Sequence, residues 1–74
     1  MEILAAVWKE GKTFVAKEIF TNVVSQGNSI EDAIQNLKEA VELYLEEFPE
    51  MAEEMQKKNV EGVLNVKIAH SFRT

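Results

Sequence analysis

The segment VVSQGNSIEDAIQNLKEAVELYLE, residues 23–46, is the most informative part of this chain for predicting its fold. Two β-branched valines lead into a Ser-Gln-Gly-Asn-Ser turn, and a periodic segment follows it. Gly27 is expected to end a short strand over residues 23–25, because glycine adopts left-handed backbone geometry without steric cost. Ser29 is the predicted N-cap of a helix, and Asp32 three residues later completes a variant of the capping box. The segment therefore predicts a strand, a tight turn and a capped helix.

The helix after Ser29 is predicted to pack one apolar face on a sheet, because its apolar residues recur at a spacing of three and four. These residues are Ile30, Ala33, Ile34, Leu37, Ala40, Val41, Tyr44 and Leu45. Pro49 disfavours helical geometry at the residue before it, so the helix should end by about Glu47. A second short helix is expected to begin at Pro49, with Met51 and Met55 on its inward face.

The residues before the turn predict an antiparallel hairpin. Residues 2–8 are apolar on both faces, which is typical of a central strand. Residues 9–12 supply a polar loop with Gly11 available for a positive φ, and residues 13–17 form the returning strand. Residues 18–22 have no clear period and are expected to be an irregular connection.

A last strand is predicted over residues 63–69, where Leu64, Val66 and Ile68 alternate with polar residues. The expected fold class is therefore α+β, a two-layer sandwich of order β-β-β-α-(short α)-β, with residues 1–74 as a single domain. A chain of 74 residues buries little surface, and without cysteine it has no disulfide to compensate. A homodimer or a higher homo-oligomer is therefore expected.

The charge of the chain is concentrated in one block. The formal net charge is −5, and residues 31–54 contain nine acidic residues against Lys38 alone. Such a block repels phosphate backbones and attracts basic surfaces, so a basic protein partner is favoured over nucleic acid. The alternative, a solvated helix face that keeps the protein soluble, stays open. No apolar run has the roughly 18 residues of a membrane span, and no secretory signal is recognisable, so we expect a cytoplasmic protein.

The residues give no support to an enzymatic activity or to a bound cofactor. His70 is the only histidine, and no carboxylate lies at a spacing that would orient its imidazole. The three glycines are Gly11, Gly27 and Gly62, which are too dispersed for a phosphate-binding loop. We therefore expect a non-catalytic protein with no cofactor and no metal site.

Four short stretches together resemble the HicB-like family, the antitoxins of HicA/HicB toxin-antitoxin pairs. They are FVAK (14–17), VSQGNSIEDA (24–33), NLKEA (36–40) and LYL (43–45). The resemblance covers about residues 1–47 and implies a HicB-like reduced ribonuclease H-like domain. It also implies an antitoxin that binds and blocks HicA, a small basic RNA-cleaving toxin.

Two features depart from that family. Residues 17–22 replace the usual loop that contains proline and glycine. Longer family members also carry a C-terminal DNA-binding domain, for which these 74 residues leave no room, so no direct DNA binding is expected. Active enzymes of the wider ribonuclease H-like fold hold two metals, but Glu2 is the only acid in residues 2–8, so a nuclease has no ligand set here.

Three functional hypotheses follow from these observations. The first is a HicB-like antitoxin that occludes a basic HicA-like toxin through Glu39, Glu42, Glu46, Glu47, Glu50, Glu53 and Glu54. The second is a self-assembling interaction module with no toxin partner, in which Leu64, Val66 and Ile68 lie on an edge strand that pairs across a two-fold axis. The third is single-stranded RNA binding through Trp8, Phe14 and Tyr44, which requires exposed rings beside basic residues.

Overall fold

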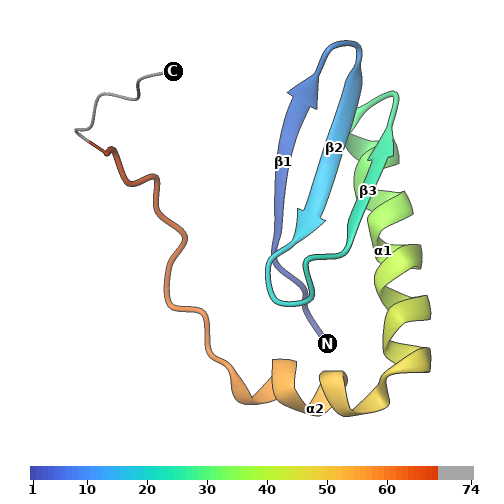
Figure 1. Ribbon diagram of the computed structural model, residues 1–74, viewed down its shortest axis with the longest axis vertical. Coiled ribbons are helices and arrows are strands. Elements are labelled where there is room, and N and C mark those ends of the chain that lie inside the picture. The colour runs from blue at the N-terminus through green and yellow to red at the C-terminus, as the bar shows by residue number, and fades with distance from the viewer. Residues whose placement is uncertain (69–74) are drawn as a thin grey trace, which may run out of the picture.

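The computed structural model describes residues 1–68, which contain three strands followed by two helices. The elements are β1 (Ala5–Glu10), β2 (Thr13–Glu18), β3 (Val24–Gly27), α1 (Ile30–Glu47) and α2 (Pro49–Lys57). The strands form one antiparallel sheet in the order β1-β2-β3. The predicted α+β class is confirmed, and the order of these five elements is the one predicted from the sequence (Figure 1).

The core lies between one face of the sheet and α1, which packs against β2 and β3. Ala16 of β2 and Ala33, Leu37 and Val41 of α1 are buried together at its centre. Helix α1 runs back along β3, and α2 lies across the end of the sheet near the N-terminus (Figure 1). Because no helix covers the opposite face of the sheet within residues 1–68, the structure has two layers there.

The first strand differs from its prediction in both bounds and position. It begins at Ala5 rather than residue 2 and extends to Glu10, because the loop is two residues long and Glu10 pairs with Thr13. Gly11 occupies the first loop position with a φ of 59°, as predicted for a positive φ at this glycine. The prediction of a central first strand is wrong. Strand β2 is central, because β3 continues the antiparallel meander on its other side.

The connection between β2 and β3 is an ordered turn built around a buried carboxylate. Glu18, which the sequence placed after the strand, is the last residue of β2 and is fully buried. Its carboxylate accepts hydrogen bonds from Phe20 N (3.2 Å), Thr21 N (2.8 Å) and Thr21 Oγ1 (2.8 Å). Asn22 completes the turn with a φ of 64°, a conformation that asparagine tolerates better than most residues. The carboxylate therefore substitutes for the backbone partners that a regular hairpin would supply.

Gly27 is required for a different reason from the one predicted. It lies inside β3, which spans Val24–Gly27 rather than residues 23–25, and its φ is not positive. A Cβ atom at Gly27 would lie 2.5 Å from Ala33 N and 2.7 Å from the Asp32 Cβ. The glycine therefore permits close packing of β3 on the first turn of α1.

Both helices follow the sequence closely. Ser29 is the N-cap of α1, and its Oγ accepts a hydrogen bond from Asp32 N at 3.0 Å. The helix ends at Glu47, and Pro49 opens α2, as predicted. Met55 is buried and Met51 half-buried, which agrees with the expected inward face of α2. Ile30 is the exception in the apolar stripe, since 53% of its surface is exposed at the start of α1.

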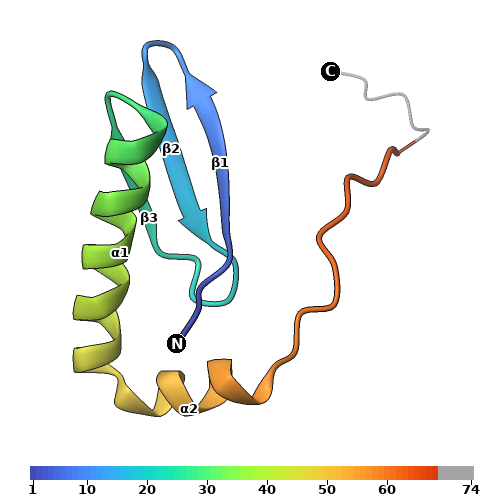
Figure 2. The ribbon, with the colours of Figure 1, turned by 180° about the vertical axis from the view of Figure 1, so that it is seen from behind.

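The strand predicted over residues 63–69 is wrong for the part that the structure describes. Residues 63–68 have no regular secondary structure, and Leu64 is 83% and Val66 is 78% exposed. Ala69 lies outside the described residues. After α2 the chain runs apart from β1 in both views of the ribbon (Figures 1 and 2). Alternation with a period of two gives a strand only where a neighbouring strand pairs with its backbone, and no strand within residues 1–68 pairs with this segment.

No helix in residues 1–68 combines the length and the apolar character needed to cross a membrane.

Candidate protein-binding surface

The seven glutamates predicted to contact a partner all lie on the solvent side of the two helices. We call them the acidic surface: Glu39, Glu42, Glu46, Glu47, Glu50, Glu53 and Glu54, all of them exposed. On α1 they lie on the opposite side from the buried Leu37 and Val41, because the helical period separates the two sets. The bend at Pro49 carries the remaining three onto α2 (Figure 1).

Among residues 1–68, only one cationic side chain forms an ion pair with a glutamate of the acidic surface. Among residues 1–68 the only ion pair joins Lys57 Nζ to Glu54 Oε1 at 3.9 Å, and both side chains are well exposed. Such a pair contributes little stability in water. Lys38 lies on α1 but forms no ion pair with the described glutamates. The acidic surface is therefore available to an external cationic group.

The position of two of these glutamates opposes the stability of α1. Glu46 and Glu47 lie in its last turn, which contains no basic residue. The negative end of the helix dipole disfavours carboxylates there by a few tenths of a kcal/mol or more. Lysine or arginine would stabilise the helix at either position. The two carboxylates therefore do not contribute to the stability of the helix.

Two apolar side chains accompany this charge, and sequence analysis did not select them. Leu43 is 65% exposed, and helical spacing places Glu39, Glu46 and Glu47 three or four residues away on the same side. Phe48 is 42% exposed at the bend between the helices, and its ring centroid lies 5.0 Å from that of Tyr44. The sequence did contain a signal for Leu43, because it falls outside the apolar stripe of α1. In protein interfaces, apolar groups of this kind lie at the centre and the polar residues form the rim.

The three aromatic residues considered for RNA stacking do not form one platform. Phe14 is half-buried against the core, whereas Trp8 lies on the other face of the sheet, opposite Val15. Trp8 Nε1 donates a hydrogen bond to Glu10 Oε1 at 2.9 Å, and Tyr44 lies on α1. Because the rings belong to separate faces, a single strand of RNA cannot stack on all three.

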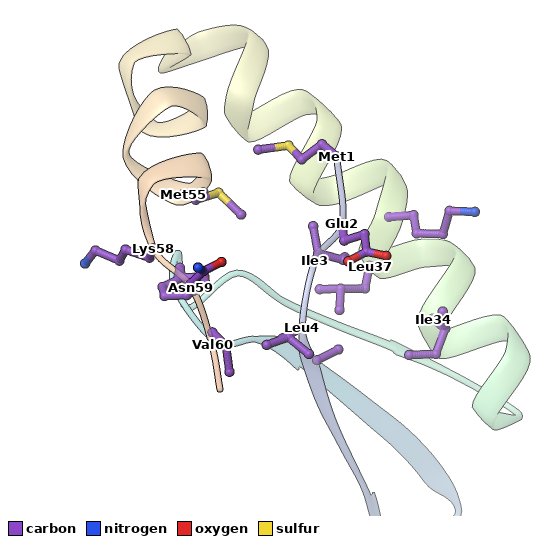
Figure 3. A pocket seen from close by; sticks show the side chains of 13 residues that line it. Met1, Glu2, Ile3, Leu4, Ile34, Leu37, Met55, Lys58, Asn59 and Val60 are labelled. Carbon is purple, nitrogen blue, oxygen red and sulfur yellow. The ribbon is translucent and has the colours of Figure 1, made fainter. Parts of the chain in front are cut away.

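A cavity of about 680 Å³ opens at the end of the sheet where α2 approaches the N-terminus (Figure 3). Its apolar lining includes Ile3, Leu4, Ile34, Leu37 and Met55, and the chain just after α2 contributes Lys58, Asn59 and Val60. This cavity could not be predicted from the sequence, because its lining comes from separate segments that meet only in the folded chain.

The described residues bring together no group of three or more His, Cys, Asp or Glu side chains that could hold a metal ion. His70, the histidine considered for catalysis, lies outside the described residues.

Comparison with known proteins does not extend these observations: no family model, no curated protein and no solved structure significantly matches the chain.

Proposed function

We propose that this chain is a non-catalytic protein-binding domain that presents its acidic surface to a basic protein. The observation that carries the proposal is the exposure of all seven glutamates with a single weak ion pair among them. Charge of this kind accelerates encounter with a cationic partner and selects against anionic ones. Leu43 and Phe48 supply exposed apolar groups that a partner can desolvate.

The identity of the partner is proposed from the resemblance to HicB-like antitoxins. On this proposal the partner is a HicA-like toxin, a small basic RNA-cleaving protein, and binding occludes the surface with which the toxin contacts RNA. The chain then acts by steric and electrostatic blocking, which requires no catalytic group. The three-stranded sheet with α1 on one face is compatible with such a domain but is not specific to it.

The proposal is tested by binding to a basic protein of similar size encoded beside this chain. We expect co-purification at low salt and inhibition of the RNA cleavage of that protein. With such a neighbour present, failure to bind at low salt would contradict the proposal.

Neutralising part of the acidic surface gives a sharper test. The triple variant Glu39→Gln, Glu42→Gln, Glu46→Gln should lower the association rate about tenfold at low salt, because electrostatic steering is lost. The matched control is Glu2→Gln, Glu10→Gln, Glu61→Gln, which removes the same charge from exposed positions outside the acidic surface. Stopped-flow or surface plasmon resonance measures both rates. Equal association rates for the two variants would show that the position of the charge is irrelevant.

A further inference from the structure

Residues 63–68, which we call the tail segment, expose the apolar side chains that the sequence assigned to a strand. Leu64, Val66 and Ile68 alternate with Asn65 and Lys67, and all of them are exposed. No backbone hydrogen bond joins the tail segment to the rest of residues 1–68. The segment therefore has the pattern of a one-sided strand but lacks a strand beside it.

The sheet has one edge that is open to a further strand. Strand β1 pairs with β2 on one side, and within residues 1–68 no backbone bond reaches its other side over Ala5–Glu10. The β3 edge is different, because Asn36 Nδ2 of α1 donates to the Gln26 carbonyl at 2.8 Å. Gly27 is also pressed against the first turn of α1. An unpaired edge such as that of β1 is a template for another strand.

The tail segment and β1 match in length and in apolar face. Both are six residues long, which corresponds to about 20 Å of strand. Ala5 and Val7 of β1 face the core but are only half-buried, since α1 packs mainly over β2 and β3. A strand added beside β1 would place its apolar side chains next to these two and extend the inner face of the sheet.

The structure favours a second copy of the chain as the partner of the tail segment. Residues 58–60 lie beside residues 1–5 at the cavity, yet from there the chain departs from its own β1 (Figures 1 and 3). Each copy offers one donor segment and one open edge, and a two-fold axis satisfies both at once. We infer that two copies of this chain form a dimer in which the tail segment of each adds a strand to the β1 edge of the other. This inference is independent of the acidic surface.

The mass of the full-length chain in solution is the first test. Light scattering at tens of micromolar concentration should give twice the 8.4 kDa chain mass. A monomer at that concentration would overturn the inference.

A pair of adjacent substitutions tests whether the tail segment makes the dimer. Val66→Glu places a charge on its apolar side, and Asn65→Glu adds the same charge one residue away on the polar side. Val66→Glu should raise the dimer dissociation constant about tenfold or more, whereas Asn65→Glu should change it little. Circular dichroism verifies that both variants fold, since neither residue belongs to the core. Equal dissociation constants for the two variants would overturn the inference.

Disulfide trapping tests whether the tail segment of one copy pairs with β1 of another. The native chain contains no cysteine, so any disulfide must form between the introduced residues. Antiparallel pairing of the two six-residue segments places Val7 opposite Val66, since Ala5 then lies opposite Ile68. Oxidation of a mixture of Val7→Cys chains and Val66→Cys chains should give a mixed disulfide dimer. Lys67→Cys, on the other side of the tail segment, should link to Val7→Cys much less. An equal yield with Lys67→Cys, or exclusive closure within one chain of the double variant Val7→Cys, Val66→Cys, would contradict strand exchange.

Discussion

Among single residues, Glu18 and Gly27 make contacts that tolerate little change. Glu18 is a charged side chain at zero exposure, and its carboxylate holds the turn between β2 and β3 through three hydrogen bonds. Such a group is tolerated only because its oxygens are satisfied. Gly27 plays the complementary steric role, since it has no Cβ where β3 meets α1.

Gly27→Ala should lower the free energy of unfolding by about 1–3 kcal/mol, because the new methyl group would overlap backbone atoms of α1. Gly62→Ala is the matched control, since nothing lies within 4 Å of a Cβ at that position. Its stability should be unchanged or slightly higher. Urea denaturation followed by circular dichroism measures both. Similar losses for the two variants would show that the contact with Ala33 does not matter.

At the scale of elements, the boundaries of α1 are determined by local chemistry at both ends. Ser29 satisfies an unpaired backbone N–H at the N-terminus, and Glu31 and Asp32 in the first turn interact favourably with the helix dipole. At the other end, Phe48 N donates to the Tyr44 carbonyl, and Pro49 opens the next helix. The two ends differ in one respect, because only the first has side chains that favour the helix electrostatically.

Ser29→Ala should cost about 1 kcal/mol of stability, because the Asp32 N–H loses its acceptor. Ser29→Asp keeps an oxygen in reach and should be close to the native protein. Thermal unfolding of the three proteins is compared by following the far-ultraviolet circular dichroism of the helices. If Ser29→Asp were as unstable as Ser29→Ala, the hydrogen bond would not be the source of the effect.

In the whole molecule, the two proposed binding surfaces lie on different elements and would bind through different interactions. The acidic surface belongs to α1 and α2 and carries charge, whereas the β1 edge and the tail segment offer backbone groups and apolar side chains. Charge attraction between exposed groups is screened by salt, while apolar burial is not. The two proposed interactions should therefore respond differently to ionic strength.

Raising the salt from about 0.05 to about 0.5 M should weaken binding to the basic partner about tenfold or more and leave the dimer nearly unchanged. Analytical ultracentrifugation of the free chain and of the mixture measures both equilibria in one buffer series. A dimer that dissociates with salt would point to charge rather than strand addition as its cause. Partner binding that is insensitive to salt would remove the basis for assigning it to the acidic surface.

The features that depend on neighbours along the chain could be predicted from the amino-acid sequence. The Ser29 cap, the apolar stripe of α1, its end at Glu47 and the start of α2 at Pro49 rest on interactions within a few residues. The exposure of the seven glutamates follows from the same helical period. Leu43 could have been found in the same way, because it interrupts the polar face.

The folded arrangement was needed to show which strand is central, why Gly27 is required and that the tail segment is unpaired within residues 1–68. Strand order depends on which edges meet, and the same alternating pattern serves a central strand, an edge strand or an unpaired segment. The need for glycine at position 27 comes from Ala33 across the layer interface, and the burial of Glu18 comes from a turn that closes over it. Strand order depends on contacts between segments distant in the chain. The contacts of Gly27 and Glu18 lie within six residues, but they depend on the path of a turn, which hydrophobic periodicity does not specify.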